Sequence, residues 1–580
     1  MVQISEIAAH TDDAPLSEPE FPSPFVFNDR DPITLVELRM RRFSGIIRAK
    51  PNWWEKVHDA ELVAKWRAEM VEQDRVSVDR LWNGVKRSDF EYGETQWPRE
   101  PITNAQLDYI FAQLKHQADQ RDPATDIYAA AVPKVYESKS LIPADLKAAF
   151  VSGAAVLEDI PDDKKDWHPG SDYQVLDLAH PSLYCLCIGR SYVHTPDAPT
   201  GANPVHLISE DEYTTHRPDL AKYIGQYDSY AISLLHQWLP TDFTVSETGN
   251  VEALSYINNL HPIHHHALYP AICSILARFV PLFEKVLSDT LSPEPPLAIT
   301  ADPFDWYSHV PDASDSDEAA EGEPEEYERW PHVPDPEPFS PPRDEGRVQF
   351  KLGGRTVQVI VKLANIVLTP ETPKYPGGSW HVEGMMNEKI VATGLYYYAC
   401  ENITESRLEF RTVVGSGDDC GMSMDYENND NIGYHTVYGF SQGDALNQKL
   451  GHIVAQEDKC VAFPNIYQHR VDGFELADST KPGYRKILCF FLVDPLTRIL
   501  STSDVPPQQA EWAMDEMQRA AALLRLPVEL FDMIAEYATV GMMSREEAEE
   551  YRADLMEERA DFMMQHNEAV FELGFSMCEH

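Results

Sequence analysis

Residues 347–370 have the sequence RVQFKLGGRTVQVIVKLANIVLTP, and this stretch indicates the fold of the segment that contains it. Apolar and polar residues alternate around Gly353-Gly354, and β-branched residues are frequent, which is typical of strands joined by a turn. Similar stretches follow, with loops between them: KIVATGLYYYAC, SRLEFRTVVG, CVAFPNIYQHRVDGFEL and YRKILCFFLVDP. Many short strands at fairly regular spacing predict a jelly-roll core over residues 347–500.

The rest of the chain divides into four further regions. Residues 1–30 are polar, acidic and rich in proline, and we expect a flexible tail. Residues 31–290 carry apolar residues at helical spacing, and we expect a mainly helical region with some strands that packs on the core. Residues 291–346 are dense in Pro, Asp and Glu and predict a linker or insertion. Residues 501–580 predict C-terminal helices. The expected fold class is α+β, with a distorted double-stranded β-helix (jelly-roll) core flanked by N- and C-terminal helices.

Two segments outside the core have patterns of their own. YQVLDLAHPSLYCLCIGRSYV, residues 173–193, predicts a pair of strands. It contains Cys185-Leu-Cys187, which no second cysteine pair follows, so we interpret it as a buried strand and not as a metal site. RLPVELFDMIAEYA, residues 525–538, resembles short helical protein-binding elements, but we expect an amphipathic helix packed on the barrel. The last helix is rich in ion-pairing residues and is expected at the surface, with a homodimer interface left open.

Composition restricts the class of protein. The 580 residues have a formal net charge of −47 and are 43% hydrophobic, so most of the chain should fold and its surface should repel phosphates. The sequence has no basic patch that would indicate nucleic-acid binding. It also has no apolar run long enough to predict a membrane helix. The eight cysteines are sparse and scattered, which favours reduced thiols in a cytoplasmic protein, with a nuclear one as the alternative.

The stretch KYPGGSWHVEG, residues 374–384, contains the first candidate site residues. On a strand, residues i and i+2 face the same side, so His381 and Glu383 should point together. A third ligand is available at His469, in FPNIYQHRV. Two histidines and one carboxylate occupy one face of an octahedral ion and leave three positions open, an arrangement that suits non-haem Fe(II) and oxygen chemistry.

Arg485 follows His469 at the start of the apolar stretch KILCFFLVDP. A cation at such a place needs a partner, because burying it unpaired is expensive. A planar guanidinium matches a carboxylate with two parallel hydrogen bonds.

His-x-Glu, a distant His and a following Arg, all within a run of jelly-roll strands, resemble the 2-oxoglutarate- and Fe(II)-dependent dioxygenase superfamily. The resemblance covers roughly residues 347–495. Motifs such as SYINNLHP, YPGGSWHVEGM, FPNIYQHRV and KPGYRKILCFFLVDP are also similar to a family of fungal proteins of unassigned function.

The superfamily resemblance implies roles for individual residues. His381, Glu383 and His469 would be the catalytic metal ligands and would bind Fe(II), and Arg485 would bind the distal carboxylate of the co-substrate 2-oxoglutarate. O2 would take the last open position, and the reaction would oxidise an unactivated C–H bond by hydroxylation or a related oxidation.

This sequence departs from the superfamily pattern at two positions. The superfamily more often has Asp where Glu383 stands. Many members also have Ser or Thr two residues after the Arg, where this chain has Ile487, so the hydroxyl of Tyr484 or Tyr467 is left as the second group for the same carboxylate.

Other residues compete for the metal or for the rest of the site. The cluster formed by His261, His264, His265 and His266 is conspicuous, but adjacent residues on a helix diverge, so we interpret it as a helix start. His435 and His452 could replace His469. Further candidates for contacts to cofactor or substrate are Lys362, Asn365, Trp380, Gln468 and Arg470.

Two other functions are weighed against the oxygenase. One is a Zn- or Mn-dependent cupin-like metal hydrolase, and the other is a non-catalytic interaction protein that retains the barrel. The substrate is expected to be a small molecule, amino acid or peptide, and the acidic surface favours a cationic or zwitterionic one.

Overall fold

A large antiparallel sheet forms the centre of the computed structural model, which describes residues 20–26, 30–86, 96–195, 204–216, 231–308, 330–415, 430–520 and 522–576. Its path runs β1-β2-β15-β12-β18-β10-β8-β9, and β3 also pairs with β10. In chain order these strands are β1 (Tyr128–Ala129), β2 (Tyr136–Ser138), β3 (Val175–Ala179), β8 (Thr241–Val245), β9 (Val251–Ala253), β10 (Thr356–Leu368), β12 (Ile390–Glu401), β15 (Cys460–Pro464) and β18 (Gly483–Val493).

A second, smaller sheet has the order β14-β13-β16, and its strands lie between β12 and β18 in the sequence. These strands are β13 (Ser406–Val413), β14 (Asn447–Ala455) and β16 (Gln468–Val471). Three two-stranded pairs complete the β structure: β11 (Lys374–Tyr375) with β17 (Phe474–Glu475), β4 (Leu186–Cys187) with β7 (His236–Gln237), and β5 (Tyr192–His194) with β6 (Val205–Leu207).

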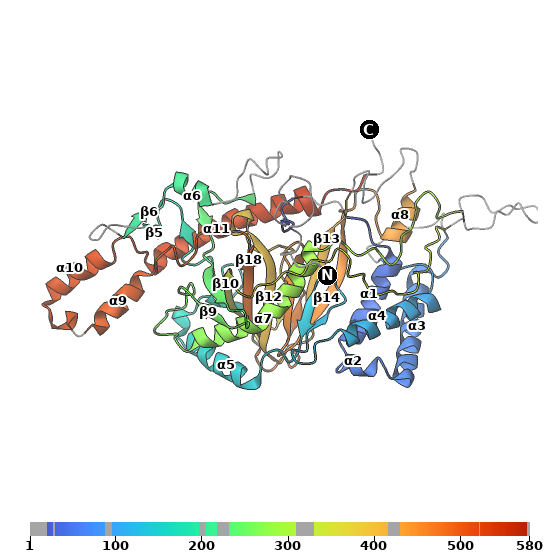
Figure 1. The fold of residues 1–580 in the computed structure, drawn as a ribbon, viewed down its shortest axis with the longest axis horizontal. Helices are drawn as coiled ribbons and strands as arrows, with labels where there is room; N and C mark the ends of the chain where they lie inside the picture. Colours follow the sequence, from blue (N-terminus) through green and yellow to red (C-terminus); the bar gives the residue numbers. More distant parts are fainter. Residues whose placement is uncertain are drawn as a thin grey trace, which may run out of the picture.

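The helices surround the sheets (Figure 1). Near the N-terminus lie α1 (Leu35–Arg48), α2 (Trp53–Lys56), α3 (Ala60–Trp82) and α4 (Asn104–Asp119). Next come α5 (Ala144–Glu158), α6 (Glu210–His216), α7 (Leu268–Leu291) and α8 (Asn431–Tyr438). The C-terminal part has α9 (Ala510–Arg519), α10 (Val528–Ala538) and α11 (Arg545–His566). No helix among these described segments combines the length and apolarity needed to cross a bilayer.

Two apolar cores lie on opposite faces of the large sheet. One core joins that sheet to α5 and α7 through residues such as Phe150, Phe279 and Phe490. The other lies between the two sheets and includes Phe491 from the large sheet and Phe410 from the small one. Because side chains alternate along a strand, Phe490 and Phe491 belong to different cores. A helix layer and two sheets therefore stack in that order.

Residues before Gly353-Gly354 do not form the strand that alternation predicts. The amides of Val348, Phe350 and Leu352 instead donate to the side chains of Ser292, Ser288 and Glu284 at the end of α7. Every second residue of an extended segment thus meets every fourth residue of a helix. The turn itself is present, and β10 begins after it.

The strand pair expected at 173–193 is also wrong. β3 pairs with β10, and β4 pairs with β7, so the two segments do not bond to each other. Cys185 and Cys187 are buried at β4, with 3.7 Å between their sulfur atoms.

The tail and the linker are described only in part. Phe21 and Phe25, in the expected tail, are buried among core residues. Residues 330–346 contain no helix or named strand. The most acidic part of the expected linker, residues 309–329, lies outside the described residues.

Candidate metal centre

His381 and His469 are held opposite each other by their own backbones. The His381 amide donates to the His469 carbonyl at 3.1 Å, and the His469 amide donates back at 2.9 Å. His469 belongs to β16, whereas His381 forms an isolated bridge and not the regular strand that was predicted. The two imidazole rings lie 4.4 Å apart between centroids.

Glu383 completes the group, as its spacing from His381 predicts. Its Oε1 atom lies 3.2 Å from His469 Nε2 and 3.8 Å from His381 Nε2. Neighbouring ligands of one ion at about 2.1 Å are separated by roughly 3 Å, so these separations fit a shared metal. His469 and Glu383 are 5% and 13% exposed, whereas His381 is 32% exposed and marks the open side.

The protonation states suit metal binding. Burial and the neighbouring His469 lower the pKa of His381 to about 4, so its ring is neutral at pH 7. His381 Nδ1 donates to the carbonyl of Ser379 at 2.8 Å, which leaves a lone pair on Nε2, the nitrogen that faces Glu383. Burial alone would raise the pKa of Glu383, but the hydrogen bond with His469 Nε2 and the electrostatic influence of both imidazoles lower it to about 2. His469 Nδ1 has no hydrogen-bond partner, so it can take the ring proton and leave a lone pair on Nε2 for a metal.

Two other described clusters could be mistaken for metal sites. In the group formed by His168, Asp177 and His180, the Ser182 amide donates to His180 Nδ1. Burial lowers the pKa of His180, so the neutral ring must carry its proton on Nε2 and has no lone pair left for a metal.

In the group formed by His261, His264 and Glu516, the histidines likewise have no Nε2 lone pair for a metal. The amides of Ile263 and His264 donate to His261 Nδ1, and Arg519 donates to His264 Nδ1. Both Nε2 atoms therefore carry protons. The expectation that this cluster is a helix start agrees with its place just before α7.

The backbone of Glu383 is clamped by Asn465. The Asn465 side chain accepts from the Glu383 amide at 2.8 Å and donates to the carbonyls of Glu383 and Ile390 at 2.9 and 3.0 Å. Asn465 is 1% exposed. Sequence reasoning missed this residue, although a lone amide in the apolar run CVAFPNIY is a signal that it bonds to backbone.

Arg485 is buried without a carboxylate partner. It lies on β18, is 2% exposed, and is flanked by the rings of Tyr397 and Phe474, each 5.5 Å away. Its Nη1 donates to Ser406 Oγ at 2.8 Å, and its Nε has no hydrogen-bond partner. No ion pair to Arg485 is found among the described carboxylates.

The hydroxyl beside Arg485 is Ser406, which sequence reasoning missed. Of the two tyrosines expected there, Tyr484 donates to Glu401 at 2.6 Å, and Tyr467 lies under Arg30. Ser406 begins a strand 79 residues before Arg485, and nothing in its local sequence indicates this contact.

Lys362 is a second cation near the site. It is half-buried on β10, opposite Cys489 of β18, and its charge lowers the pKa of both Asp177 and Glu383. Within the described part of the chain, its ammonium forms no ion pair or hydrogen bond.

The remaining candidates point elsewhere. Asn365 bonds to Glu158 and Tyr398 on the helical side of the large sheet. Gln468 bonds to Arg411 and Asn567, and Arg470 pairs with Glu409. Trp380 lies near both Arg411 and Arg470. His435 bonds to Ser441, and His452 lies on β14 opposite Glu409, so neither joins His381 and Glu383.

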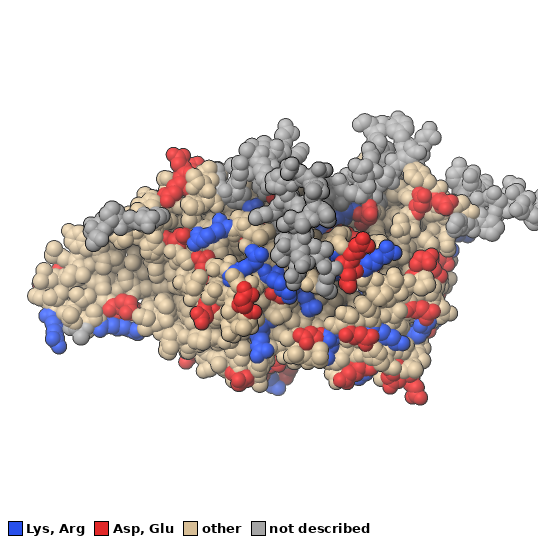
Figure 2. Space-filling model, viewed as in Figure 1, with Lys and Arg blue, Asp and Glu red and all other residues tan. Residues whose placement is uncertain are grey.

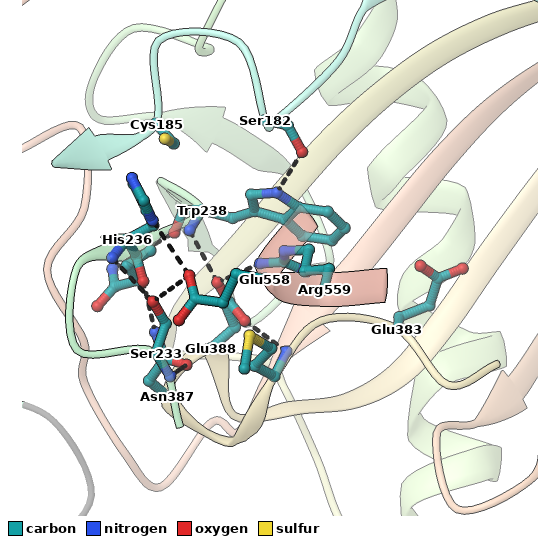
Figure 3. Close-up of polar contacts among 12 residues, drawn as sticks. Ser182, Cys185, Ser233, His236, Trp238, Glu383, Asn387, Glu388, Glu558 and Arg559 are labelled. Carbon is teal, nitrogen blue, oxygen red and sulfur yellow. Dashed lines mark hydrogen bonds and ion pairs between the residues drawn. The ribbon is translucent and has the colours of Figure 1, made fainter. Parts of the chain in front are cut away.

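Next to the segment that contains His381 and Glu383, a polar network joins Glu388 to α11 (Figure 3). Glu388 accepts from the Trp238 amide at 2.9 Å and pairs with Arg559 at 2.6 Å. Nearby, Ser233 and His236 both bond to the same oxygen of Glu558. Because the serine hydroxyl donates to the carboxylate and not to the imidazole, this trio is not arranged as a nucleophile with its base.

Comparisons with known proteins include two solved structures of low similarity. An Fe(II)/α-ketoglutarate-dependent dioxygenase, TqaL, is 11% identical with a TM-score of 0.20, and the match covers 45% of this chain and 67% of that one. A BsmA homologue from Methylobium petroleophilum PM1 is 10% identical with a TM-score of 0.13, over 24% of this chain and 43% of that one. Likenesses this low carry no argument about fold or function, and no curated protein matches the chain.

Family models match most of the sequence. One, described as the N-terminal domain of unknown function DUF4246, matches residues 8–69. The other, described as protein of unknown function DUF4246, matches residues 104–516, a span that includes the candidate metal centre, Asn465 and Arg485. The chain therefore belongs to the DUF4246 family.

Proposed function

We propose that this protein is an Fe(II)- and 2-oxoglutarate-dependent oxygenase that oxidises an unactivated C–H bond of a small-molecule, amino-acid or peptide substrate. The observation that carries the proposal is the pairing of two features. Two histidines and a carboxylate converge with a neutral His381 that presents its Nε2 lone pair. Elsewhere on the strands around the same core, Arg485 is a buried guanidinium that lacks an anion.

Strand order supports a double-stranded β-helix around this site. Along the chain, β10, β12, β15 and β18 belong to the large sheet. Between them, β13, β14 and β16 form the small one, and the isolated His381 bridge pairs with β16 at its edge. The sequence large, small, large, small, small, large, small, large is the alternation that a jelly roll of eight strands requires.

The charges support a dicarboxylate as co-substrate. Arg485 and Lys362 have no carboxylate partner among the described residues, and a buried cation without an anion is costly. Residues at positions 362, 364 and 366 of β10 share one face, and Ile366 lies opposite Arg485 in the register. Both cations thus belong to strands that enclose the same interior, where an anion with two carboxylates would neutralise them.

Each residue has a defined task in this proposal. His381, Glu383 and His469 would hold the metal, and the 32% exposure of His381 leaves an open side for substrate. Arg485 and Ser406 would grip the distal carboxylate, and Asn465 keeps Glu383 in place. When bound, Fe(II) with 2-oxoglutarate and O2 supplies C–H oxidation, with succinate and CO2 as co-products. The apolar rings of Phe410 and Phe463 exclude water beside His469.

Anaerobic titration tests the proposal. Purified metal-free protein receives Fe(II) and then 2-oxoglutarate while visible absorption is recorded. A weak charge-transfer band that appears only with both additions is expected, because a chelating keto acid needs open positions on the metal. Glu383→Ala should lose the band and the bound iron while its circular dichroism spectrum stays unchanged.

Other outcomes would support the alternatives. Stoichiometric metal without a 2-oxoglutarate-dependent band would favour a Zn- or Mn-dependent hydrolase. Failure to bind any divalent metal would favour a non-catalytic barrel protein.

A further inference from the structure

The α9–α10 arm leaves a row of apolar side chains in water. This arm, residues 510–538, projects from the body at the left of Figure 1, where α10 packs mainly on α9. The expectation that α10 packs on the barrel is therefore wrong. Leu530, Met533, Ile534 and Tyr537 are 47%, 52%, 37% and 76% exposed.

The four side chains form one stripe. Their positions are i, i+3, i+4 and i+7, the spacing by which a helix anchors itself in an apolar groove. The buried side of α10 contains Ala535, which belongs to a different face of the same helix. Val528 and Val540, 65% and 68% exposed, extend the apolar surface at both ends. Contiguous apolar surface of this kind marks an interaction site.

An 11-residue helix whose apolar stripe is exposed to water needs a partner to be stable. Isolated helices shorter than about 12–15 residues are marginal in water, and most helical stability in proteins comes from packing an apolar face. α10 has its apolar stripe in solvent, and its N-cap, Pro527, makes no side-chain capping bond. Its base is well anchored, because Arg190 donates to the carbonyls of Gly541 and Met542. The arm is thus held at the base and unpaired along its length.

An acidic edge runs along the stripe. Glu529, Asp532 and Glu536 are exposed at i, i+3 and i+7, and none of them forms an ion pair with another described residue. α10 contains no basic residue. Figure 2 shows few charged side chains on the visible face of this end of the molecule.

The charge pattern selects among possible occupants. A second copy that paired its stripe antiparallel to the first would align both acidic edges on one side, and the net charge of −47 on each chain would add repulsion. Helices that lie on membranes carry Lys and Arg on the polar face, which α10 lacks. Basic residues on a partner would match the acidic edge.

We propose that α10 is a docking helix for a partner protein, and that its stripe enters an apolar surface edged by Lys and Arg. Leu530, Met533, Ile534 and Tyr537 are the anchors, and Glu529, Asp532 and Glu536 set the orientation. This role is independent of the metal centre.

A designed peptide probes this chemistry. The probe is a fluorescein-labelled helical Leu–Lys peptide with leucine at i, i+3, i+4 and i+7, and the matched Leu–Glu peptide is its control. Binding to the full chain is followed by fluorescence anisotropy. The stripe variant is Leu530→Ser/Tyr537→Ser, and the edge variant is Glu529→Lys/Asp532→Lys/Glu536→Lys.

A second acidic helix supplies the matched control. Glu550, Asp554 and Glu557 are exposed on α11, and changing all three to Lys alters the net charge by the same amount as the edge variant. We expect the stripe and edge variants each to weaken Leu–Lys binding by about tenfold or more, and the α11 variant by no more than about twofold.

Three results would overturn the proposal. Equal weakening by the edge and α11 variants would mean that the peptide senses only bulk charge. Unchanged binding by the stripe variant, with its circular dichroism spectrum intact, would mean that the apolar stripe is not used. A halved mass of the stripe variant in light scattering would mean that a second copy covers α10.

Discussion

Asn465 positions Glu383 through its backbone, so its loss should weaken both the fold and metal binding. In Asn465→Ala, the amide of Glu383 and the carbonyls of Glu383 and Ile390 lose their partner. Each buried unpaired group costs about 1–3 kcal/mol, so with three such groups we expect the free energy of unfolding to fall by about 3 kcal/mol or more. Loss of a group that orients a metal ligand costs about 10–100-fold in affinity. Urea unfolding of the metal-free protein and calorimetric titration with Co(II) measure the two effects.

The conservative variant Asn465→Asp separates positioning from packing. It keeps the acceptor for the Glu383 amide but loses the donor to two carbonyls. An intermediate Co(II) affinity is expected. If both variants lost stability and bound Co(II) as tightly as the original protein, Asn465 would support only the fold.

Arg485 should be dispensable for the fold of the protein without ligand. A buried charge is often replaced by an apolar side chain of similar size at no cost, or with a gain of about 1–4 kcal/mol. Arg485 has only Ser406 and aromatic rings as neighbours, so Arg485→Met should not lower the free energy of unfolding. It should abolish measurable 2-oxoglutarate binding while Co(II) affinity stays within about twofold. Strong destabilisation in urea unfolding would show instead that Arg485 is structural.

Sequence spacing predicted that His381 and Glu383 lie together, but it did not predict the groups that support the candidate site. His381 and Glu383 are two residues apart, and a strand-like segment points both to one side even without a regular strand. Asn465 and Ser406 act through contacts to residues 82 and 79 positions away. Such contacts depend on how strands pair across sheets, which the sequence of either strand alone does not specify.

At the scale of elements, Arg559 attaches α11 to the loop that follows Glu383. The pair between Arg559 and Glu388 is 2.6 Å long, and the Glu388 side chain is fully buried. Removing one partner of a buried pair costs about 3–5 kcal/mol, because the other charge is left uncompensated. Arg559→Met should therefore lower the free energy of unfolding by about 3 kcal/mol, as measured in urea.

A double variant tests the cause of this loss. In Glu388→Gln/Arg559→Met no buried charge remains, so much of the lost stability should return. An additive effect of the two substitutions would contradict the coupling. α11, expected as a surface helix, is in fact half-embedded, with Leu555 and Phe562 buried.

Periodicity predicted helices better than it predicted strand partners. Helical spacing of apolar residues predicted the region that contains α1, α3 and α4, because amphipathic helices owe their pattern to one buried face. The same reasoning misplaced α10, whose apolar face is exposed. β14 was not predicted, because NQKLGHIVA is interrupted by Gly451, which lies at a bulge opposite Phe410 and Arg411. Pairing such as β3 with β10 joins residues almost 200 positions apart and leaves no local trace.

At the scale of the whole molecule, the segment near residue 24 meets the end of α11 at His566. Its Nε2 donates to the carbonyl of Pro24 at 2.8 Å, and its ring stacks on Phe562 and contacts Phe25 and Phe571. Burial lowers the pKa of His566 to about 4 from an ordinary value of 6.5. A segment near residue 24 therefore depends on a neutral imidazole at the end of α11.

This arrangement predicts that the free energy of unfolding falls as the pH is lowered. Because the pKa of His566 is lower in the folded protein, the unfolded chain binds a proton first as the pH falls below 6.5. Stability is thus present above pH 6.5 and is lost toward pH 4. Between pH 7 and pH 5 the free energy of unfolding should fall by about 2 kcal/mol through this residue.

Urea unfolding of the original protein and of His566→Gln at both pH values measures this contribution. The variant should be less stable at pH 7, because it loses the aromatic contacts, but its stability should change less between pH 7 and pH 5. Other buried histidines titrate in both proteins, so the difference between their pH dependences isolates His566. Parallel pH dependences would mean that the imidazole can be protonated in the folded state, and that the contact with Pro24 does not require its neutral form.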